Sequence, residues 1–355
     1  METCRRRPAH PALRGVASFC LAGTLALGGC GERGADQPLD PTTAAVVESL
    51  EGLAFVPSGR TALDIDIRVD VDLLVDRFEL TGTIWKDLFG DEDPRPQSFG
   101  TFVERQVGAV APGAWSSQAP AVGMTLDEAR EAARRRGMRL PTFEEWLWCA
   151  AGPRSRRFPA GRQQRGLANT LDLGLVRPTP VGAFESGQTP DTGLFDLLGN
   201  VWEWTEPPPP PVGWRTIDAD SWPASGGTGA PAWVMGGSFA TPEQVLFTRD
   251  GVALARGTTP GHRASDVGMR CVADATPFLV DLARRAGGLR GAARERVVAV
   301  GARWGGRSME SLWAAQLEAP GHPWIEALLE GAGGGRAGGN VGEVALPGAS
   351  RRSPR

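Results

Sequence analysis

The sequence is poor in the residues that carry much of enzyme chemistry. It has no tyrosine, one lysine (Lys86), three histidines and five cysteines among 355 residues. His262 and His322 are the only histidines beyond the N-terminal region, and they lie far apart, which argues against a histidine-based zinc or iron site. The formal net charge of −3 argues against a nucleic-acid-binding surface.

The N-terminal apolar run is too short to span a bilayer as a finished helix. Residues 16–27 follow a basic stretch, Arg5 to Arg7, and have the length of a signal-peptide core. The run ends at Leu27-Gly28-Gly29-Cys30, which resembles a bacterial lipobox, where cleavage precedes a lipid-modified cysteine. We therefore expect residues 1–29 to be a lipoprotein signal peptide, with a plain secretory signal or a signal anchor as the alternatives.

This interpretation predicts where the mature chain resides. Cys30 would carry the lipid, and residues 30–51 would form a tether between the membrane and the folded part. Gly31 follows the cysteine in place of an aspartate, which favours the outer membrane in bacteria that read that position. The expected location is the bacterial cell envelope, lipid-anchored on the periplasmic or outer-membrane side.

Cysteine counting leaves one pair in the mature protein. Cys4 and Cys20 would leave with the signal peptide, and Cys30 would be lipidated. Cys149 and Cys271 remain, and an oxidising compartment makes a disulfide between them plausible. Two separate buried thiols are the alternative.

The stretch 193–204, GLFDLLGNVWEW, combines apolar and aromatic residues with three polar ones. Trp202 and Trp204 flank Glu203 at a period of two, so both rings point one way and the carboxylate the other. A carboxylate in such surroundings needs a cation or hydrogen-bond donors. One interpretation is a core strand whose Glu203 reaches solvent or a backbone N–H. The other is a cation site formed with Asn200 and backbone carbonyls, because Ca²⁺ prefers oxygen ligands.

Local patterns predict several helices and strands. Two segments carry the signature of a helix that starts with a capping box: Thr125 with Glu128, and Thr142 with Glu145. Alternation of apolar and charged residues over 63–78 predicts a half-buried strand, which could form a hairpin. Further strands are expected at 54–56, 233–239 and 267–273, and further helices at 42–53, 84–89, 278–300, 309–317 and 324–329. Residues 275–330 would form a helical extension, and the Gly-rich, basic segment 331–355 a disordered tail.

Several motifs occur in an order typical of one family. RLPTFEEW, FDLLGNVWEW, VMGGSF and VGMRCV follow the upstream segments FVPSG, VDRFELT and PAVGMTLDEA. Together they resemble the formylglycine-generating enzyme, or sulfatase-modifying factor, domain over residues 52–274. The resemblance implies an α+β class, with an irregular, loop-rich fold similar to that of C-type lectins.

The resemblance also implies a chemistry that this sequence departs from. Active members oxidise a sulfatase cysteine to formylglycine with O₂ and a copper ion held by two cysteines, which follow the GGS-aromatic motif. By position these fall at Thr241 and Leu246, and no cysteine occurs between Cys149 and Cys271. Copper(I) needs soft thiolate ligands, so copper and the oxidase activity are not expected.

Other family features transfer residue by residue. The family's calcium site at GNVWEW implies side-chain ligands at Asn200 and Glu203, with carbonyl oxygens of Leu198, Gly199 and Val201. A second calcium site would use Asn169 and Thr170. The family often links the helix after RLPT to the strand near VGMRCV by a disulfide, which here implies Cys149 and Cys271.

Two main functions remain after this comparison. The first is a non-catalytic, lipid-anchored domain that binds or scaffolds an envelope protein or peptide, since loop-rich domains suit recognition. The second is an oxidoreductase that makes formylglycine, or another reaction in the same cleft. Polar residues that could build that cleft include Ser238, Thr241, Arg249, Asp250, Arg263 and Asp266. A regulatory partner of an envelope kinase or secretion system is a third, weaker idea.

Overall fold

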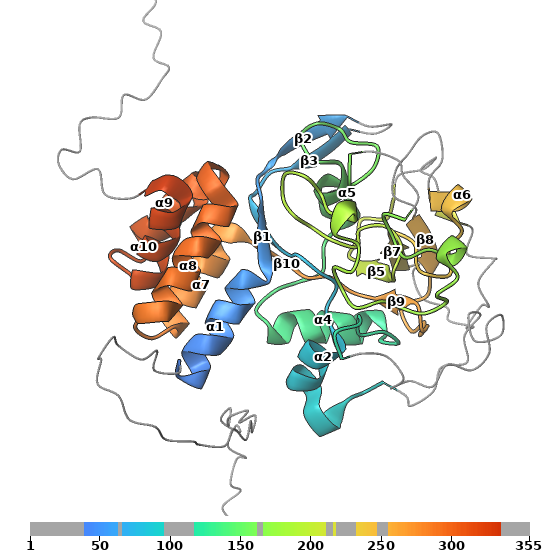
Figure 1. Cartoon of the computed structure of the whole chain (residues 1–355), viewed down its shortest axis with the longest axis horizontal. Coiled ribbons are helices and arrows are strands. Elements are labelled where there is room, and N and C mark those ends of the chain that lie inside the picture. Colours follow the sequence, from blue (N-terminus) through green and yellow to red (C-terminus); the bar gives the residue numbers. More distant parts are fainter. Residues whose placement is uncertain are drawn as a thin grey trace, which may run out of the picture.

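The computed structural model describes residues 39–62, 66–95, 117–161, 166–210, 216–217, 232–246 and 255–334 (Figure 1). The predicted signal peptide, Cys30 and residues 335–355 lie outside the described residues. The described helices include α1 (Pro41–Glu51), α2 (Gly82–Phe89), α4 (Leu126–Arg135), α5 (Phe143–Ala151), α6 (Glu243–Leu246), α7 (Ala275–Arg285), α8 (Gly291–Trp304), α9 (Met309–Glu318) and α10 (Pro323–Leu329). In this part of the chain no helix is both long and apolar enough to cross a membrane.

The strands form three small sheets. A three-stranded antiparallel sheet has the order β1 (Leu53–Val56), β4 (Leu73–Asp76), β10 (Val272–Asp274). A hairpin pairs β2 (Gly59–Ala62) with β3 (Asp66–Val69). A five-stranded mixed sheet has the order β6 (Thr216–Ile217), β8 (Ala255–Thr258), β7 (Ala232–Met235), β5 (Trp202–Thr205), β9 (Val267–Gly268). Short strands joined by long irregular segments make this an α+β, loop-rich fold, as the sequence predicted.

Both predicted capping boxes are present. The backbone N–H of Glu128 donates to Thr125 Oγ1 at 3.3 Å, and the N–H of Thr125 donates to the Glu128 carboxylate at 3.0 Å. Thr142 and Glu145 make the same reciprocal pair at the start of α5. Each box satisfies N–H groups that the first turn of a helix leaves free, which is why these two helix starts are readable from sequence.

The alternating segment 63–78 divides between two sheets. In β3, Ile67 and Val69 are buried while Asp66 and Arg68 are exposed, as expected for a half-buried hairpin strand. β4 is not part of this hairpin, and all four of its residues are buried because it is the central strand between β1 and β10. The half-buried strand is thus present at β3, but a hairpin within 63–78 is not, because β3 pairs with β2, which precedes the segment, and β4 pairs with β1 and β10.

The sheet β1-β4-β10 is covered on both faces. Phe55 and Leu74 point into one apolar cluster, which contains the C-terminal helices, and Val56 and Val75 point into another, which contains α5. Figure 1 shows this arrangement, with α1 and α7 to α10 on one side of β1 and β10 and the rest of the molecule on the other. A strand buried on both faces reads as a continuous apolar run, and β1 is Leu-Ala-Phe-Val.

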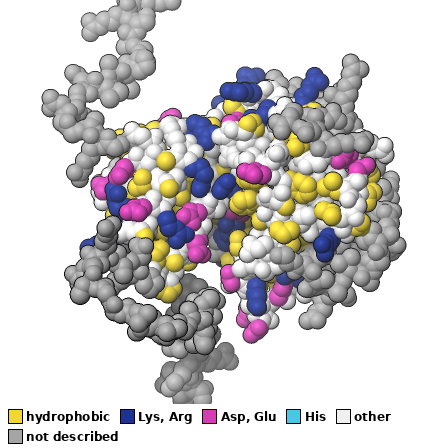
Figure 2. Space-filling view, viewed as in Figure 1, with side chains coloured by type: hydrophobic (Ala, Val, Ile, Leu, Met, Phe, Trp, Pro, Cys, Tyr) yellow, Lys and Arg dark blue, Asp and Glu magenta, His cyan; other side chains and the backbone are white. Residues whose placement is uncertain are grey.

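The C-terminal helices are therefore part of the core. Trp304 of α8 is fully buried and donates from Nε1 to the carbonyl of Leu53 at 3.2 Å. The predicted helix 278–300 is interrupted where Gly287 and Gly288 separate α7 from α8. Figure 2 shows basic and acidic side chains interspersed over the outer surface of this helical group, which fits helices whose apolar faces point inward.

Candidate functional site

The stretch 193–204 forms a compact turn followed by strand β5. Four of its residues have positive φ: Gly193 at 68°, Asp196 at 56°, Gly199 at 74° and Asn200 at 53°. At Gly199 a Cβ atom would lie 2.3 Å from the carbonyl oxygen of Asn169, so the backbone conformation and the close contact both demand glycine. This turn sets the directions of Asn200 and Glu203.

Glu203 faces a buried guanidinium. Arg270 contacts the Glu203 carboxylate at 2.7, 3.0 and 3.1 Å, and Trp146 Nε1 donates to it at 2.6 Å. The side chains of both charged residues are at most 1% exposed. Burial alone would lower the pKa of Arg270, but the charge and hydrogen bonds of Glu203 raise it above the ordinary value. Glu203 is therefore the counter-ion of Arg270.

Arg270 also holds two segments of backbone. Its Nη1 donates to the carbonyl of Asp76 at 2.8 Å, and its Nη2 donates to the carbonyl of Phe195 at 2.7 Å. The guanidinium thus joins β4, the 193–204 turn and β5. A buried charge pair is tolerated when its remaining donors are satisfied in this way.

Asn200 belongs to a second, separate network. Its Oδ1 accepts hydrogen bonds from Asn169 Nδ2 at 3.1 Å and from the N–H of Thr179 at 2.9 Å. Its Nδ2 donates to Glu79 Oε2 at 2.5 Å, and the N–H of Val201 donates to Glu79 Oε1 at 3.1 Å. Glu79 is the partner that sequence reasoning missed, because it lies 121 residues from Asn200.

These contacts correct the predicted calcium ligand set. The Glu203 oxygens already accept from Arg270 and Trp146, and Asn200 Oδ1 faces N–H and O–H donors. Such surroundings do not fit a cation held jointly by Asn200, Glu203 and the carbonyls of 198, 199 and 201. No group of three or more His, Cys, Asp or Glu side chains suited to a metal occurs in the described part of the chain. Calcium binding as such stays a prediction.

The second predicted calcium pair is buried. Asn169 Nδ2 donates to the carbonyl of Arg177 at 2.8 Å, while Asn169 Oδ1 is buried without a hydrogen-bond partner. Thr170 Oγ1 lies 3.4 Å from a Glu243 oxygen. One free oxygen at Asn169 is compatible with a cation, and this site also stays a prediction.

The two cysteines do not form the predicted disulfide. Both are free and buried. Cys149 lies near Arg270, among the apolar residues on the α5 side of the sheet, whereas Cys271 lies in the opposite cluster. Burial raises the pKa of Cys149 to about 12 and holds the pKa of Cys271 well above its ordinary value.

The residues at the family's copper positions are built into the core. Thr241 is only 5% exposed, and its Oγ1 accepts a hydrogen bond from the N–H of Ser238 at 2.9 Å. Leu246 is 1% exposed and packs on Gly237, where a Cβ would lie 2.3 Å from Leu246 Cδ2. Ser238 Oγ donates to Asp266 at 2.9 Å.

The remaining polar candidates do not converge on Ser238. Arg263 pairs with Glu128 of α4 and also donates to the carbonyl of Gly123 at 3.0 Å. Arg249 and Asp250 lie outside the described residues. Of the cleft residues suggested by sequence, the structure therefore brings together Ser238, Thr241 and Asp266.

Two buried carboxyl groups near Arg270 have raised pKa values. Burial raises the pKa of Asp196 to about 6, although the N–H of Gly182 donates to it at 2.7 Å. Burial, with the charges of Asp196 and Glu203, holds the pKa of Glu79 well above its ordinary value. The carboxyl groups of Glu79, Asp196 and Glu203 thus surround the buried guanidinium of Arg270. Of the three, Glu203 makes the direct ion pair.

The pKa of Asp196 predicts a pH dependence of stability. Below its ordinary pKa of 3.8 the carboxyl is protonated in both states, and as pH rises toward 6 the unfolded chain loses that proton first. The free energy of unfolding should therefore fall by about 3 kcal/mol over this range. Asp196→Asn keeps an acceptor for Gly182 and tolerates positive φ. We expect it to be more stable than the wild type at pH 7, with a shallower fall between pH 4 and 6.

Urea unfolding at a series of pH values measures this effect. Glu79, whose pKa is also raised, lowers the free energy of unfolding as pH rises. The slope of this free energy against pH should therefore be smaller in Asp196→Asn but not zero. Asp91→Asn, at an exposed surface carboxyl, is the matched control and should keep the wild-type profile. An Asp196→Asn profile parallel to that of the wild type would contradict the assignment.

Comparison with known proteins identifies the family to which the chain is similar. Residues 54–275, more than half of the chain, match the family described as the sulfatase-modifying factor enzyme 1-like domain. The chain is 33% identical over 159 residues to hercynine oxygenase from Mycolicibacterium smegmatis, covering 38% of this chain and 37% of that protein. It is 30% identical over 180 residues to the formylglycine-generating enzyme of Mus musculus, covering 45% and 46%.

A third relative carries a different description. The chain is 29% identical over 168 residues to the inactive C-alpha-formylglycine-generating enzyme 2 of Bos taurus, covering 44% of this chain and 50% of that protein. The chain thus spans about half or less of the length of these relatives. Since the family match covers most of the described body, the chain belongs to the family of the sulfatase-modifying factor enzyme 1-like domain.

Proposed function

We propose that this chain is a lipid-anchored protein of the bacterial cell envelope. Its sulfatase-modifying-factor domain would bind or scaffold a protein or peptide partner without oxidising it. The observation that carries the non-catalytic part is the packing of Thr241 and Leu246. Neither side chain offers a soft ligand, and both are buried in contacts with the Ser238 and Gly237 backbone.

The other cysteines do not supply a substitute copper site. Cys149 and Cys271 are buried on opposite faces of the β1-β4-β10 sheet, and their raised pKa values keep them as thiols at neutral pH. Copper(I) binds the thiolate form, so two separated, protonated thiols form a poor site. One relative of similar identity is named a formylglycine-generating enzyme and another is named inactive, so overall identity does not decide between the two functions.

The alternative is an oxidoreductase that converts a sulfatase cysteine to formylglycine, or other chemistry in the same cleft. The hydrogen bond from Ser238 to Asp266 is the feature of the cleft that favours it. However, Ser238 is fully buried. Its hydroxyl donates to Asp266 and accepts from the N–H of Ala240 at 3.2 Å. These contacts suit a residue that fixes the backbone after Gly237.

An oxidation assay separates the two functions. The purified chain is incubated with copper(I), O₂ and a cysteine-containing sulfatase peptide, and the peptide mass is followed. We expect no conversion of thiol to aldehyde, because no thiolate pair holds copper. The formylglycine-generating enzyme of Streptomyces coelicolor, a relative 30% identical over 174 residues, is the positive control. Formation of the aldehyde peptide by this chain would refute the non-catalytic proposal.

Lipid anchoring is tested at Cys30, which lies outside the described residues. In a bacterial host fed with labelled palmitate, the full-length chain should incorporate label and sediment with the envelope membranes. Cys30→Ala should lose both properties because the acceptor thiol is gone, whereas Cys20→Ala, inside the predicted signal peptide, should retain both. Equal labelling of Cys30→Ala and wild type would refute the anchor.

A further inference from the structure

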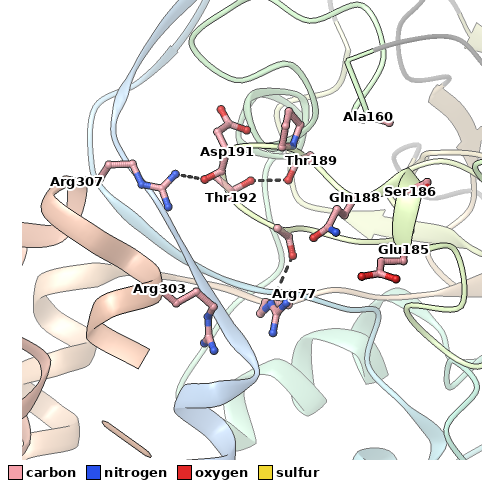
Figure 3. Close-up of a pocket in the computed structure, with 12 residues that line it drawn as sticks. Arg77, Ala160, Glu185, Ser186, Gln188, Thr189, Asp191, Thr192, Arg303 and Arg307 are labelled. Atoms are coloured by element: carbon pink, nitrogen blue, oxygen red, sulfur yellow. Dashed lines mark hydrogen bonds between the residues drawn. The ribbon is translucent and has the colours of Figure 1, made fainter. Parts of the chain in front are cut away.

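A polar pocket lies where the family domain meets the C-terminal helices. Its volume is about 470 Å³, which falls in the range of small-molecule sites. One wall is the loop 185–193 of the domain, together with Arg77, which follows β4. The other wall carries Arg303 from α8 and Arg307 from the short 3-10 turn Gly305–Ser308 (Figure 3).

Backbone carbonyls hold each of the three arginines in place. Arg303 Nη2 donates to the carbonyls of Glu51 at 2.9 Å and Leu53 at 3.0 Å, at the C-terminal end of α1 and the start of β1. Arg307 Nη1 donates to the carbonyl of Asp191. Arg77 Nε lies 3.4 Å from the carbonyl of Gly193 and its guanidinium is stacked near the Phe78 and Phe195 rings. These contacts orient the guanidinium groups but do not neutralise them.

The acidic residues nearby have other partners or remain apart. Asp191 forms its ion pair with Arg156 at 2.8 Å, and Glu51 forms its pair with Arg296 at 2.6 Å. Glu185 lines the pocket without an ion pair to any of the three arginines. Within the described ranges, Arg77, Arg303 and Arg307 therefore have no carboxylate at ion-pair distance. Figure 2 shows several basic side chains, with acidic ones beside them, along the boundary between the helical group and the body.

Two of these charges disfavour each other. Burial and the neighbouring charge of Arg77 lower the pKa of Arg303 to about 10 although the charge of Glu51 acts to raise it, and burial lowers the pKa of Arg77. If Arg77 and Arg303 had only a structural role, we would expect a carboxylate to pair with them, as Glu203 pairs with Arg270 inside the domain. Here the pocket itself lies where a counter-ion would be expected, and its lining includes Thr189 and Thr192, whose hydroxyls bond each other at 2.6 Å.

We propose that this pocket binds an oxyanion, the phosphate or carboxylate group of a small ligand, between Arg77 and Arg303 with Arg307 at the rim. Guanidinium forks match both groups in shape and charge. Gly193 forms part of the lining and has a positive φ of 68°, a backbone conformation that favours glycine. Arg303 and Arg307 lie beyond the family match at residues 54–275, so the extension supplies one wall of the site and the domain supplies the other.

The site goes beyond the proposed function and does not depend on it. A binding domain and an oxidase would each retain this pocket, because neither Thr241 nor Leu246 is among the residues that line it. Small-ligand binding would also bridge the extension and the domain, since one anion contacts arginines from both.

Calorimetry and thermal unfolding with inorganic phosphate, succinate and chloride at matched ionic strength test the proposal. Wild type should bind phosphate or succinate and gain thermal stability, while chloride should have no such effect. The anion that binds more tightly identifies the ligand group. Arg77→Gln and Arg303→Gln should each raise the Kd about tenfold, the loss expected for a charge-assisted hydrogen bond. Arg285→Gln, whose exposed side chain pairs with Asp281 on α7, is the control and should bind as wild type.

Folding effects are separated from binding effects by a second variant. Arg303→Gln loses contacts to the end of α1, so its circular dichroism is compared with that of wild type. Arg77→Lys keeps the charge but loses the fork, and it should bind more tightly than Arg77→Gln and more weakly than wild type. No binding of either anion by folded wild type would overturn the site, as would wild-type affinity in Arg77→Gln.

Discussion

The structure depends on the buried ion pair between Arg270 and Glu203. The Arg270 guanidinium joins the end of β4 to the turn and strand β5 of residues 193–204, which are distant from β4 in sequence. Few regular elements surround it, so the loops take their positions from such polar contacts more than from long ladders. Removing one partner of a buried pair leaves an uncompensated charge, which typically costs about 3–5 kcal/mol. A loop-rich domain of this kind therefore relies on a small number of buried polar side chains.

Local patterns in the sequence predicted many of the helices and strands. They did not predict which side chains distant in sequence contact each other. The helix starts at Thr125 and Thr142 follow from residues three positions apart, and the structure contains both boxes. The importance of Glu203 was also evident, because a carboxylate between two tryptophans needs a partner. The sequence did not identify that partner, because Arg270 is 67 residues away from Glu203 and a metal cation would satisfy the same requirement. Glu79 was missed for the same reason, because it lies 121 residues from Asn200.

The C-terminal extension shows the same limit. Composition predicted its helices, but not that α8 would place Trp304 against β1 and leave Arg303 facing Arg77. The all-apolar strand β1 carried a signal of two covered faces, which implies that a second layer is needed. The extension supplies that layer, and in doing so it creates the arginine-lined pocket at the boundary. Family membership explains the domain, whereas the pocket arises from what this chain adds to it.

A double-mutant cycle on Arg270→Met and Glu203→Leu, measured by urea unfolding in calcium and in chelator, tests the central claim most directly. If the two side chains neutralise each other, each single variant loses about 3–5 kcal/mol and the double variant loses clearly less than the sum. The coupling should be equal in both buffers, because the counter-ion of Glu203 is a guanidinium. Additive losses, or a Glu203→Leu loss that appears only in calcium, would contradict the account.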